Sequence, residues 1–263
     1  MDRVLMYRGN VLTTENGNGG WVGKVTPFTL SEFSDIGEVF ADLEHGDKVG
    51  FVLRHSERDD TAQKNLTAAG IQYARDTGAK LADGIVTSSD DIALYSSSAQ
   101  RCIDTAKYIA QGTGLYTGTT PEVTIDELLL KNHYEVTAPE TGWEDYSLAA
   151  YGEPCIYGGV FANIPAVTAS MYGYLQNKIT KKLNIFITHD QQLEMFTVTM
   201  CKRLIGLRFW SGAVNDGITE RRWITYLAGL AIIRRASGSF EYYPVKSLDK
   251  GFQRDYNNIY TPG

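Results

Sequence analysis

The sequence contains no run of eighteen or more apolar residues, and its first ten residues, MDRVLMYRGN, have no apolar core of the signal-peptide type. It therefore predicts neither a membrane-spanning helix nor a secretory leader. Cysteine is scarce as well. Cys102, Cys155 and Cys201 are an odd number without a C-x-x-C pair, which argues against a disulfide framework or a zinc site. The default expectation is a reduced compartment such as the cytoplasm.

An excess of basic residues is also missing. The chain has 25 lysines and arginines against 31 acidic residues, and its formal net charge is −6. This balance favours neither a nucleic-acid nor an anionic-membrane partner, although an acidic protein can still hold a local basic pocket for an anionic substrate. The length of 263 residues suits one large domain or two small ones, and we expect a single domain over residues 1–263.

Short apolar runs alternate with segments of helical spacing. The runs KVGFVLR, DIALYSS and KKLNIFITHD predict three buried strands, and apolar residues recur at helical spacing over 66–81, 102–110 and 193–204. Strands that alternate with helices predict an α/β fold with a mostly parallel sheet. Near the end of the chain, WITYLAGLAIIRR and SFEYYPVK predict two paired strands, with Ser237-Gly238 at the turn.

Side chains that can cap a helix precede two of these segments. Asn65 or Thr67 can start the first helix, and Ser97 or Ser98 can cap the second. The stretch from about 115 to 160 is rich in Tyr, Gly, Glu and Pro and has little periodicity. We expect it to form a loop-rich insertion over the core, as part of a cap-like region that extends to about residue 180.

Reactive side chains stand where the predicted parallel strands end. Ligands of open parallel sheets bind beyond the carboxyl ends of the strands, so we expect three arginines, two histidines and an aspartate to converge there. Guanidinium groups bind phosphoryl oxygens, a neutral imidazole can attack phosphorus, and a carboxylic acid can protonate the leaving oxygen. Because positioned cations can hold the charge of the transferring group, this chemistry requires no metal. The six residues are Arg54, His55, Arg58, Arg101, His189 and Asp190.

Four segments resemble, in order, the motifs of the histidine phosphatase superfamily, which includes the histidine acid phosphatases and the phosphoglycerate mutase-like enzymes. LRHSER is similar to its R-H-G-x-R opening, NLTAAGIQYA to L-T-x-x-G-x-x-Q-A, and YSSSAQRCIDTA to S-S-x-x-x-R-x-x-x-T-A. ITHD resembles the second histidine motif in the H-D form of the acid-phosphatase branch. These motifs cover roughly residues 49–112 and 183–205, which is under half of the chain.

The resemblance implies a three-layer α/β/α fold of the phosphoglycerate mutase-like type and a small phosphorylated substrate, with no cofactor and no metal. It implies that His55 is the nucleophile that becomes phosphohistidine, which water then hydrolyses. It also implies that Arg54, Arg58 and Arg101 hold the phosphate oxygens with the help of His189.

Two residues are candidates for the acid that protonates the leaving oxygen. Asp190 follows the second histidine, as the donor of the acid-phosphatase branch does. The mutase-like branch takes its donor from a loop after the third arginine, where IDELLL offers Glu127. We prefer Asp190, which also stands where a helix N-cap belongs. His133, in the insertion, can contact the substrate or simply lie in solvent.

The sequence departs from the family's pattern beside the first histidine. Ser56 replaces the usual glycine, which crowds the phosphate site but supplies a hydroxyl that can donate to phosphate. Asp59 and Asp60 stand where a proline often follows, and either can form an ion pair with Arg58. The Trp-Asn stretch that follows the first histidine of the mutases is absent, which favours a hydrolase.

Three functions stay open on this basis. The first is a metal-independent phosphomonoester hydrolase that works through phosphohistidine on His55. The second is a phosphoglycerate mutase-like phosphotransferase, and the third is a non-catalytic member that binds phosphorylated ligands through its arginine pocket. The sequence predicts neither the particular phosphomonoester nor the oligomeric state.

Overall fold

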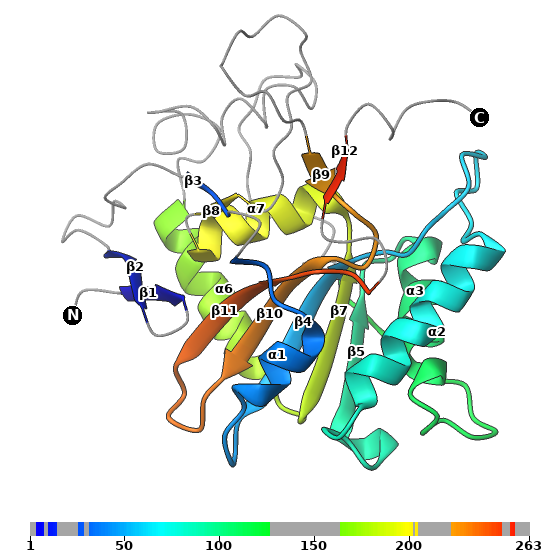
Figure 1. Ribbon diagram of the computed structural model, residues 1–263, viewed down its shortest axis with the longest axis horizontal. Helices are drawn as coiled ribbons and strands as arrows, with labels where there is room; N and C mark the ends of the chain where they lie inside the picture. Colours follow the sequence, from blue (N-terminus) through cyan, green and yellow to red (C-terminus); the bar gives the residue numbers. More distant parts are fainter. Residues whose placement is uncertain are drawn as a thin grey trace, which may run out of the picture.

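The centre of the protein is a six-stranded sheet in a computed structural model that describes residues 4–7, 10–14, 26–28, 32–126, 164–201, 203–204, 222–248 and 253–255 (Figure 1). In spatial order its strands are β11 (Phe240–Val245), β10 (Gly229–Arg234), β4 (Lys48–Arg54), β7 (Leu183–Thr188), β5 (Ile92–Ser96) and β6 (Thr124–Ile125). Strands β4, β7, β5 and β6 run parallel, whereas β10 is antiparallel to both β4 and β11. The predicted α/β class and the antiparallel pair near the end of the chain are confirmed.

Helices cover both faces of this sheet, so the fold has three layers (Figure 1). One layer contains α1 (Ile36–Ala41), α2 (Ala68–Ala82) and α3 (Gln100–Gly112), and the other contains α6 (Ile164–Lys178) and α7 (Asp190–Cys201). All six residues of β7 are buried, because the strand is covered on both sides, and its sequence is accordingly a nearly continuous apolar run. The three-layer arrangement implied by the resemblance is what the structure shows.

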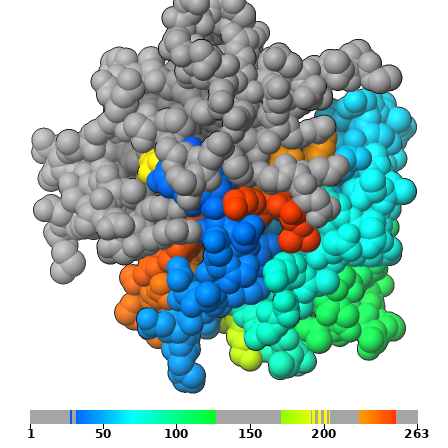
Figure 2. Space-filling view, viewed as in Figure 1, coloured from blue at the N-terminus to red at the C-terminus, as the bar shows by residue number. Residues whose placement is uncertain are grey.

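Segments far apart in the sequence adjoin on the surface. The backbone N–H of Ser34 donates to Pro244 O at 2.8 Å, and Lys246 N–H donates to Ser34 O at 3.0 Å. Figure 2 shows the result, with the segment around α1 in blue beside the end of β11 in red.

The remaining elements are short: β1 (Val4–Tyr7) with β2 (Asn10–Thr14), β3 (Thr26–Pro27) with β8 (Arg203–Leu204), β9 (Arg222–Ile224) with β12 (Gln253–Asp255), and the 3-10 helix η2 (Ser89–Asp91).

Of the two helix caps predicted from the sequence, one is observed and the other is not. Thr67 is the N-cap of α2, as predicted, and its hydroxyl accepts a hydrogen bond from the first turn. Helix α3 instead begins after Ala99, with no side-chain cap, so the expectation that Ser97 or Ser98 caps it was wrong. The hydroxyl of Ser97 contacts the ring of His189 instead.

Most of the predicted insertion, residues 127–163, lies outside the described residues. Residues 164–178 form α6, and the ring of Tyr174 in this helix lies 6.3 Å from that of Phe186 in β7, so the last part of the expected cap-like region packs on the sheet. No helix in the described ranges combines the length and the apolar character needed to cross a membrane. Within those same ranges, no three His, Cys, Asp or Glu side chains are grouped as a metal site would require.

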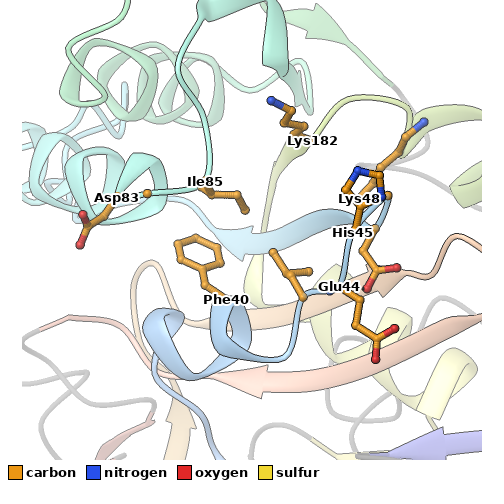
Figure 3. Close-up of a pocket in the computed structure, with 11 residues that line it drawn as sticks. Phe40, Glu44, His45, Lys48, Asp83, Ile85 and Lys182 are labelled. Carbon is orange, nitrogen blue, oxygen red and sulfur yellow. Dashed lines mark hydrogen bonds between the residues drawn. The ribbon is translucent and has the colours of Figure 1, made fainter.

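One hollow lies at the edge of the sheet where β4 and β7 begin. It has a volume of about 530 Å³, and Phe40 and Ile85 form part of its apolar wall beside His45, Lys48 and Lys182 (Figure 3). The parallel strands carry the predicted reactive residues at their other ends, and none of those residues lines this hollow. The candidate site is therefore at the opposite edge of the sheet.

Candidate active site

Neighbouring strands bring the predicted reactive residues together. Arg54, the last residue of β4, pairs in register with Thr188, the last residue of β7. The next residue, His55, donates its backbone N–H to Thr188 O at 2.9 Å. His189 follows Thr188 directly, so the parallel register alone places the two histidines side by side. Their ring centroids are 5.5 Å apart, with an interplanar angle of 68°.

His55 has a neutral ring with a defined tautomer. Its Nδ1 lies 2.8 Å from Ser56 O, and since a carbonyl oxygen can only accept, Nδ1 carries the hydrogen and Nε2 keeps its lone pair. Burial, and secondly the positive charge of Arg54, holds the pKa of His55 well below its usual value of 6.5. The ring therefore stays unprotonated at neutral pH, with Nε2 as a nucleophilic atom.

His189 has the opposite tautomer. Arg101 donates from Nη2 to Nδ1 of His189 at 3.0 Å, so the hydrogen of this imidazole lies on Nε2, which is 3.1 Å from Ser97 Oγ. Burial and the charge of Arg101 lower the pKa of His189 to about 4. Cys102 Sγ lies 3.6 Å from Nε2 of the same ring, and burial raises the pKa of this thiol to about 12. Cys102 is therefore an uncharged packing partner of His189.

Arg54 is held at both terminal nitrogens. Nη1 donates to Ile224 O at 2.5 Å, and Nη2 lies 3.1 Å from Oδ2 of Asp190. The guanidinium carbon lies 4.4 Å from the ring centroid of Tyr226, which is within cation–π range. Nε of Arg54 is buried and has no hydrogen-bond partner among the described residues.

Arg101 offers a second buried donor of the same kind. It is the second residue of α3, where the helix dipole disfavours a cation. Burial lowers its pKa from the usual value, and within the described part of the chain its Nε also has no hydrogen-bond partner. Two buried guanidinium N–H groups in need of acceptors, beside two neutral imidazoles, have the chemistry to bind an oxyanion.

Arg58 lies at the exposed rim of the site. Its Nη1 donates to Asp59 O at 2.8 Å and pairs with Oδ1 of Asp60 at 2.9 Å, and the Asp60 side chain is 99% exposed. The pair with Asp60 is one of the two ion pairs that the sequence analysis allowed for Arg58. An exposed ion pair contributes about 0–1 kcal/mol, so an anion in the site can compete with Asp60 for the guanidinium. The positive charge of Arg58 already contributes to the lowered pKa of His189 and of Arg101.

The loop after His55 is packed tightly against the start of α2. Ser56 is fully buried, its hydroxyl donates to Gly70 O at 2.7 Å, and its N–H donates to Thr105 Oγ1 at 3.0 Å. A Cβ atom at position 70 would collide with the backbone oxygen of Glu57, which explains the glycine in NLTAAG. Because the hydroxyl of Ser56 already has a backbone acceptor, its donation to a phosphate stays a prediction, and the observed contact is a structural one.

Asp190 begins helix α7 and lies in the site through its ion pair with Arg54. It is the first helical residue, and the backbone oxygen of His189 before it accepts from Leu193 N–H at 2.9 Å. The structure thus brings five of the six predicted polar groups into one cluster, in which Arg54, His55 and His189 are buried, with Arg58 at its edge. Glu127 and His133 lie outside the described residues, so their roles stay predictions.

Sequence reasoning missed two contributors to this cluster. Ser97 was interpreted as a helix cap, although its place directly after β5 puts it at the same sheet edge as His55 and His189. Tyr226 lies in the turn between β9 and β10, far from any motif, and its half-buried ring has its centroid 5.7 Å from that of His55. The pairing of β10 with β4 brings it there, and that pairing has no local signal in the sequence.

Known proteins provide a comparison for this arrangement. Residues 50–136 match one family model. That model describes the histidine phosphatase superfamily (branch 1). The resemblance inferred from the sequence is confirmed over this segment, which contains Arg54, His55 and Arg101. The match ends before His189 and Asp190, so the acid-phosphatase form of the H-D pair stays a prediction.

Solved structures similar to this chain include a mutase and two phosphatases. The phosphoglycerate mutase of Bacillus anthracis str. Sterne is 14% identical, with a TM-score of 0.44 over 76% of this chain and 92% of that one. A phosphoserine phosphatase of Entamoeba histolytica is 16% identical, with a TM-score of 0.44 over 74% and 94%. A mycobacterial glucosyl-3-phosphoglycerate phosphatase is 15% identical, with a TM-score of 0.43 over 75% and 97%. No curated protein matches the sequence.

Proposed function

We propose that this protein is a phosphatase that hydrolyses small phosphate monoesters, without a metal, through a phosphohistidine on His55. The observation that carries the proposal is the cluster of two neutral imidazoles and two guanidiniums whose buried Nε–H groups lack partners among the described residues. A phosphoryl group can accept from those donors while its phosphorus faces the lone pair of His55. The match of residues 50–136 to the histidine phosphatase superfamily supports the same chemistry.

The reaction has two displacement steps at phosphorus. In the first, the Nε2 lone pair of His55 forms a bond to phosphorus, and the bond from phosphorus to the ester oxygen breaks. The hydrogen bond from Nδ1 to Ser56 O then stabilises the positive charge that develops on the ring. In the second step a water oxygen attacks phosphorus, the P–N bond breaks, and inorganic phosphate leaves a neutral His55.

The arginines neutralise the charge of the transferring group. Arg54 is buried, Arg101 is half-buried, and hydrogen bonds hold both in place, so they need little rearrangement as charge develops in the transition state. Arg58 adds a third cation once it leaves Asp60. His189 is neutral and is anchored by Arg101 and Ser97. We assign it the role of a donor to a phosphoryl oxygen, after a shift of its Nε2–H from Ser97.

Asp190 is our first candidate for the acid that protonates the leaving oxygen. Its carboxylate is already at the site, 3.1 Å from Arg54. A phosphoryl group that binds Arg54 would weaken this ion pair, which frees the carboxyl group to take up a proton and to deliver it to the leaving oxygen. Glu127 is the alternative donor and requires the same test.

Release of phosphate from a generic aryl phosphate in the presence of EDTA tests the proposal. A hydrolase releases phosphate under these conditions and loses this activity with His55→Ala, while the exposed His45→Ala, at the opposite edge of the sheet, keeps it. A mutase instead needs a bisphosphorylated primer and releases little phosphate. A non-catalytic member binds orthophosphate and releases none from the ester.

A further inference from the structure

Tyr226 contacts Arg54 and His55, the two consecutive residues at the end of β4. Its ring centroid is 4.4 Å from the guanidinium carbon of Arg54 and 5.7 Å from the ring centroid of His55, at an interplanar angle of 43°. Arg54 and His55 are 7% and 3% exposed, whereas Tyr226 is only partly buried. One aromatic side chain is therefore in contact with both buried groups and is itself only partly buried.

The turn that carries Tyr226 is fixed to the end of β4 by three hydrogen bonds. Arg54 donates from Nη1 to Ile224 O at 2.5 Å and from its backbone N–H to Ala228 O at 3.1 Å. Leu227 N–H donates back to Arg54 O at 3.1 Å. Leu227 also has a φ of 59°, a left-handed conformation that leucine rarely adopts and that persists only where its surroundings enforce it. The backbone around Tyr226 is thus held in a defined position relative to Arg54.

We propose that Tyr226 is a positioning residue, which holds the guanidinium of Arg54 and the imidazole of His55 in the geometry required by a phosphoryl group. The inference rests on the proposed function, because it concerns the same anion site. A ring face attracts a guanidinium without using any of its N–H donors. Ile224 O accepts from Nη1 and Asp190 pairs with Nη2, so the contact with Tyr226 orients Arg54 and still leaves Nε–H available for a phosphoryl oxygen.

Two variants at position 226 distinguish the contribution of the ring face from that of the hydroxyl. Tyr226→Phe keeps the face and should bind orthophosphate as the wild type does. Tyr226→Leu removes the face, so Arg54 gains freedom and water reaches the guanidinium. We expect its dissociation constant for orthophosphate to rise about tenfold. In turnover of an aryl phosphate, we expect Tyr226→Leu to raise KM and to lower kcat, because Arg54 and His55 both lose the contact that orients them.

A matched control exists on the helical layer. Arg75 lies over the ring of Tyr108 at 5.0 Å, which is the same type of contact outside the site. Tyr108→Leu removes that pair and should leave the orthophosphate affinity unchanged. Isothermal titration calorimetry with inorganic orthophosphate, on the wild type and the three variants, measures all of these affinities. Thermal denaturation reports whether each variant is folded, and Tyr226→Met replaces Tyr226→Leu if the latter does not fold.

The outcomes distinguish this inference from the proposed function. Weakened binding in Tyr226→Leu, with normal binding in Tyr226→Phe and Tyr108→Leu, supports the inference even if the wild type releases no phosphate from esters. Wild-type affinity in Tyr226→Leu overturns it, although ester hydrolysis by the wild type would still stand. Equal losses in Tyr226→Leu and Tyr226→Phe also overturn it, because they would trace the effect to the hydroxyl, and a wild type that binds no orthophosphate overturns it as well.

Discussion

The rings of His55 and His189 lie edge to face with their centroids 5.5 Å apart, and their partners select opposite tautomers. The backbone oxygen of Ser56 fixes the hydrogen of His55 on Nδ1, whereas Arg101 fixes the hydrogen of His189 on Nε2. One ring therefore presents a lone pair and the other a donor. This asymmetry is what the proposed mechanism requires, with His55 as the nucleophile and His189 as a supporting donor.

Replacement of Arg101 by glutamine should weaken orthophosphate binding. The variant loses a half-buried cation whose buried Nε lacks a partner among the described residues, and it also loses the anchor of His189. A hydrogen bond to a charged group contributes roughly 1.5–3 kcal/mol, so the dissociation constant should rise roughly ten- to a hundredfold. Arg75→Gln is the matched control, since Arg75 lies on α2 and bonds to Gln111. Equal affinities in the two variants would contradict the assignment of Arg101.

The identity of the proton donor can be read from leaving-group dependence. If Asp190 donates, Asp190→Asn should slow hydrolysis of an alkyl phosphate by roughly 10²–10⁴-fold and that of a nitrophenyl phosphate far less. The nitrophenolate leaving group of the second ester departs without a proton. Both rates are measured at saturating substrate, with Asp60→Asn, which breaks only the exposed pair with Arg58, as the control. Similar losses for both esters would exclude Asp190 and direct the same comparison to Glu127→Gln.

Acidic pH should destabilise the fold through His189. Its folded pKa of about 4 lies below the usual 6.5, so the unfolded chain takes up a proton first as the pH falls. Stability is unaffected by this group above pH 6.5 and is lost progressively between about pH 6.5 and pH 4, by roughly 3 kcal/mol. Urea denaturation across this range should show a shallower pH dependence for His189→Gln than for the wild type or for His45→Gln, in which the replaced histidine is exposed. Parallel slopes would contradict the assignment.

Gly70→Ala should destabilise the protein and disturb the loop after His55. Its Cβ would collide with Glu57 O, and overpacking of this kind costs about 1–3 kcal/mol. Gly173→Ala, inside α6 with nothing near its added Cβ, should instead stabilise the protein by about 0.5–1 kcal/mol. Denaturant midpoints measure both changes. Unchanged stability in Gly70→Ala would contradict this prediction, because the loop would then move aside without any loss of stability.

The parts of the fold that the sequence predicts are those with a local signal. The buried strands β4 and β7 are apolar runs, and the rule for parallel sheets then places Arg54, His55 and His189 at one edge. The start of α2 was predicted because the hydroxyl of Thr67 caps it in the ordinary way. Where a side chain has a choice of partners, local rules fail, as with Ser97, which contacts a histidine from a distant strand rather than its own helix.

Tyr226 illustrates what could not be predicted. Its position follows from the pairing of β10 with β4 and from the left-handed turn at Leu227, and neither has a motif. Similarly, the sequence shows that Asp60 can pair with Arg58 but not whether the pair forms, because an exposed ion pair is almost neutral in free energy. The sequence therefore could not predict contacts between distant strands or ion pairs whose free energy is close to zero.

Trapping of a phosphoenzyme tests whether His55 is the nucleophile. The protein is mixed with a reactive aryl phosphate, quenched at alkaline pH, where phosphohistidine survives, and analysed by peptide mass spectrometry and ³¹P NMR. We expect one phosphoryl group, attached to Nε2 of His55 and absent from His55→Ala. A phosphoryl group on any other residue, or phosphate release by His55→Ala at the wild-type rate, would contradict it.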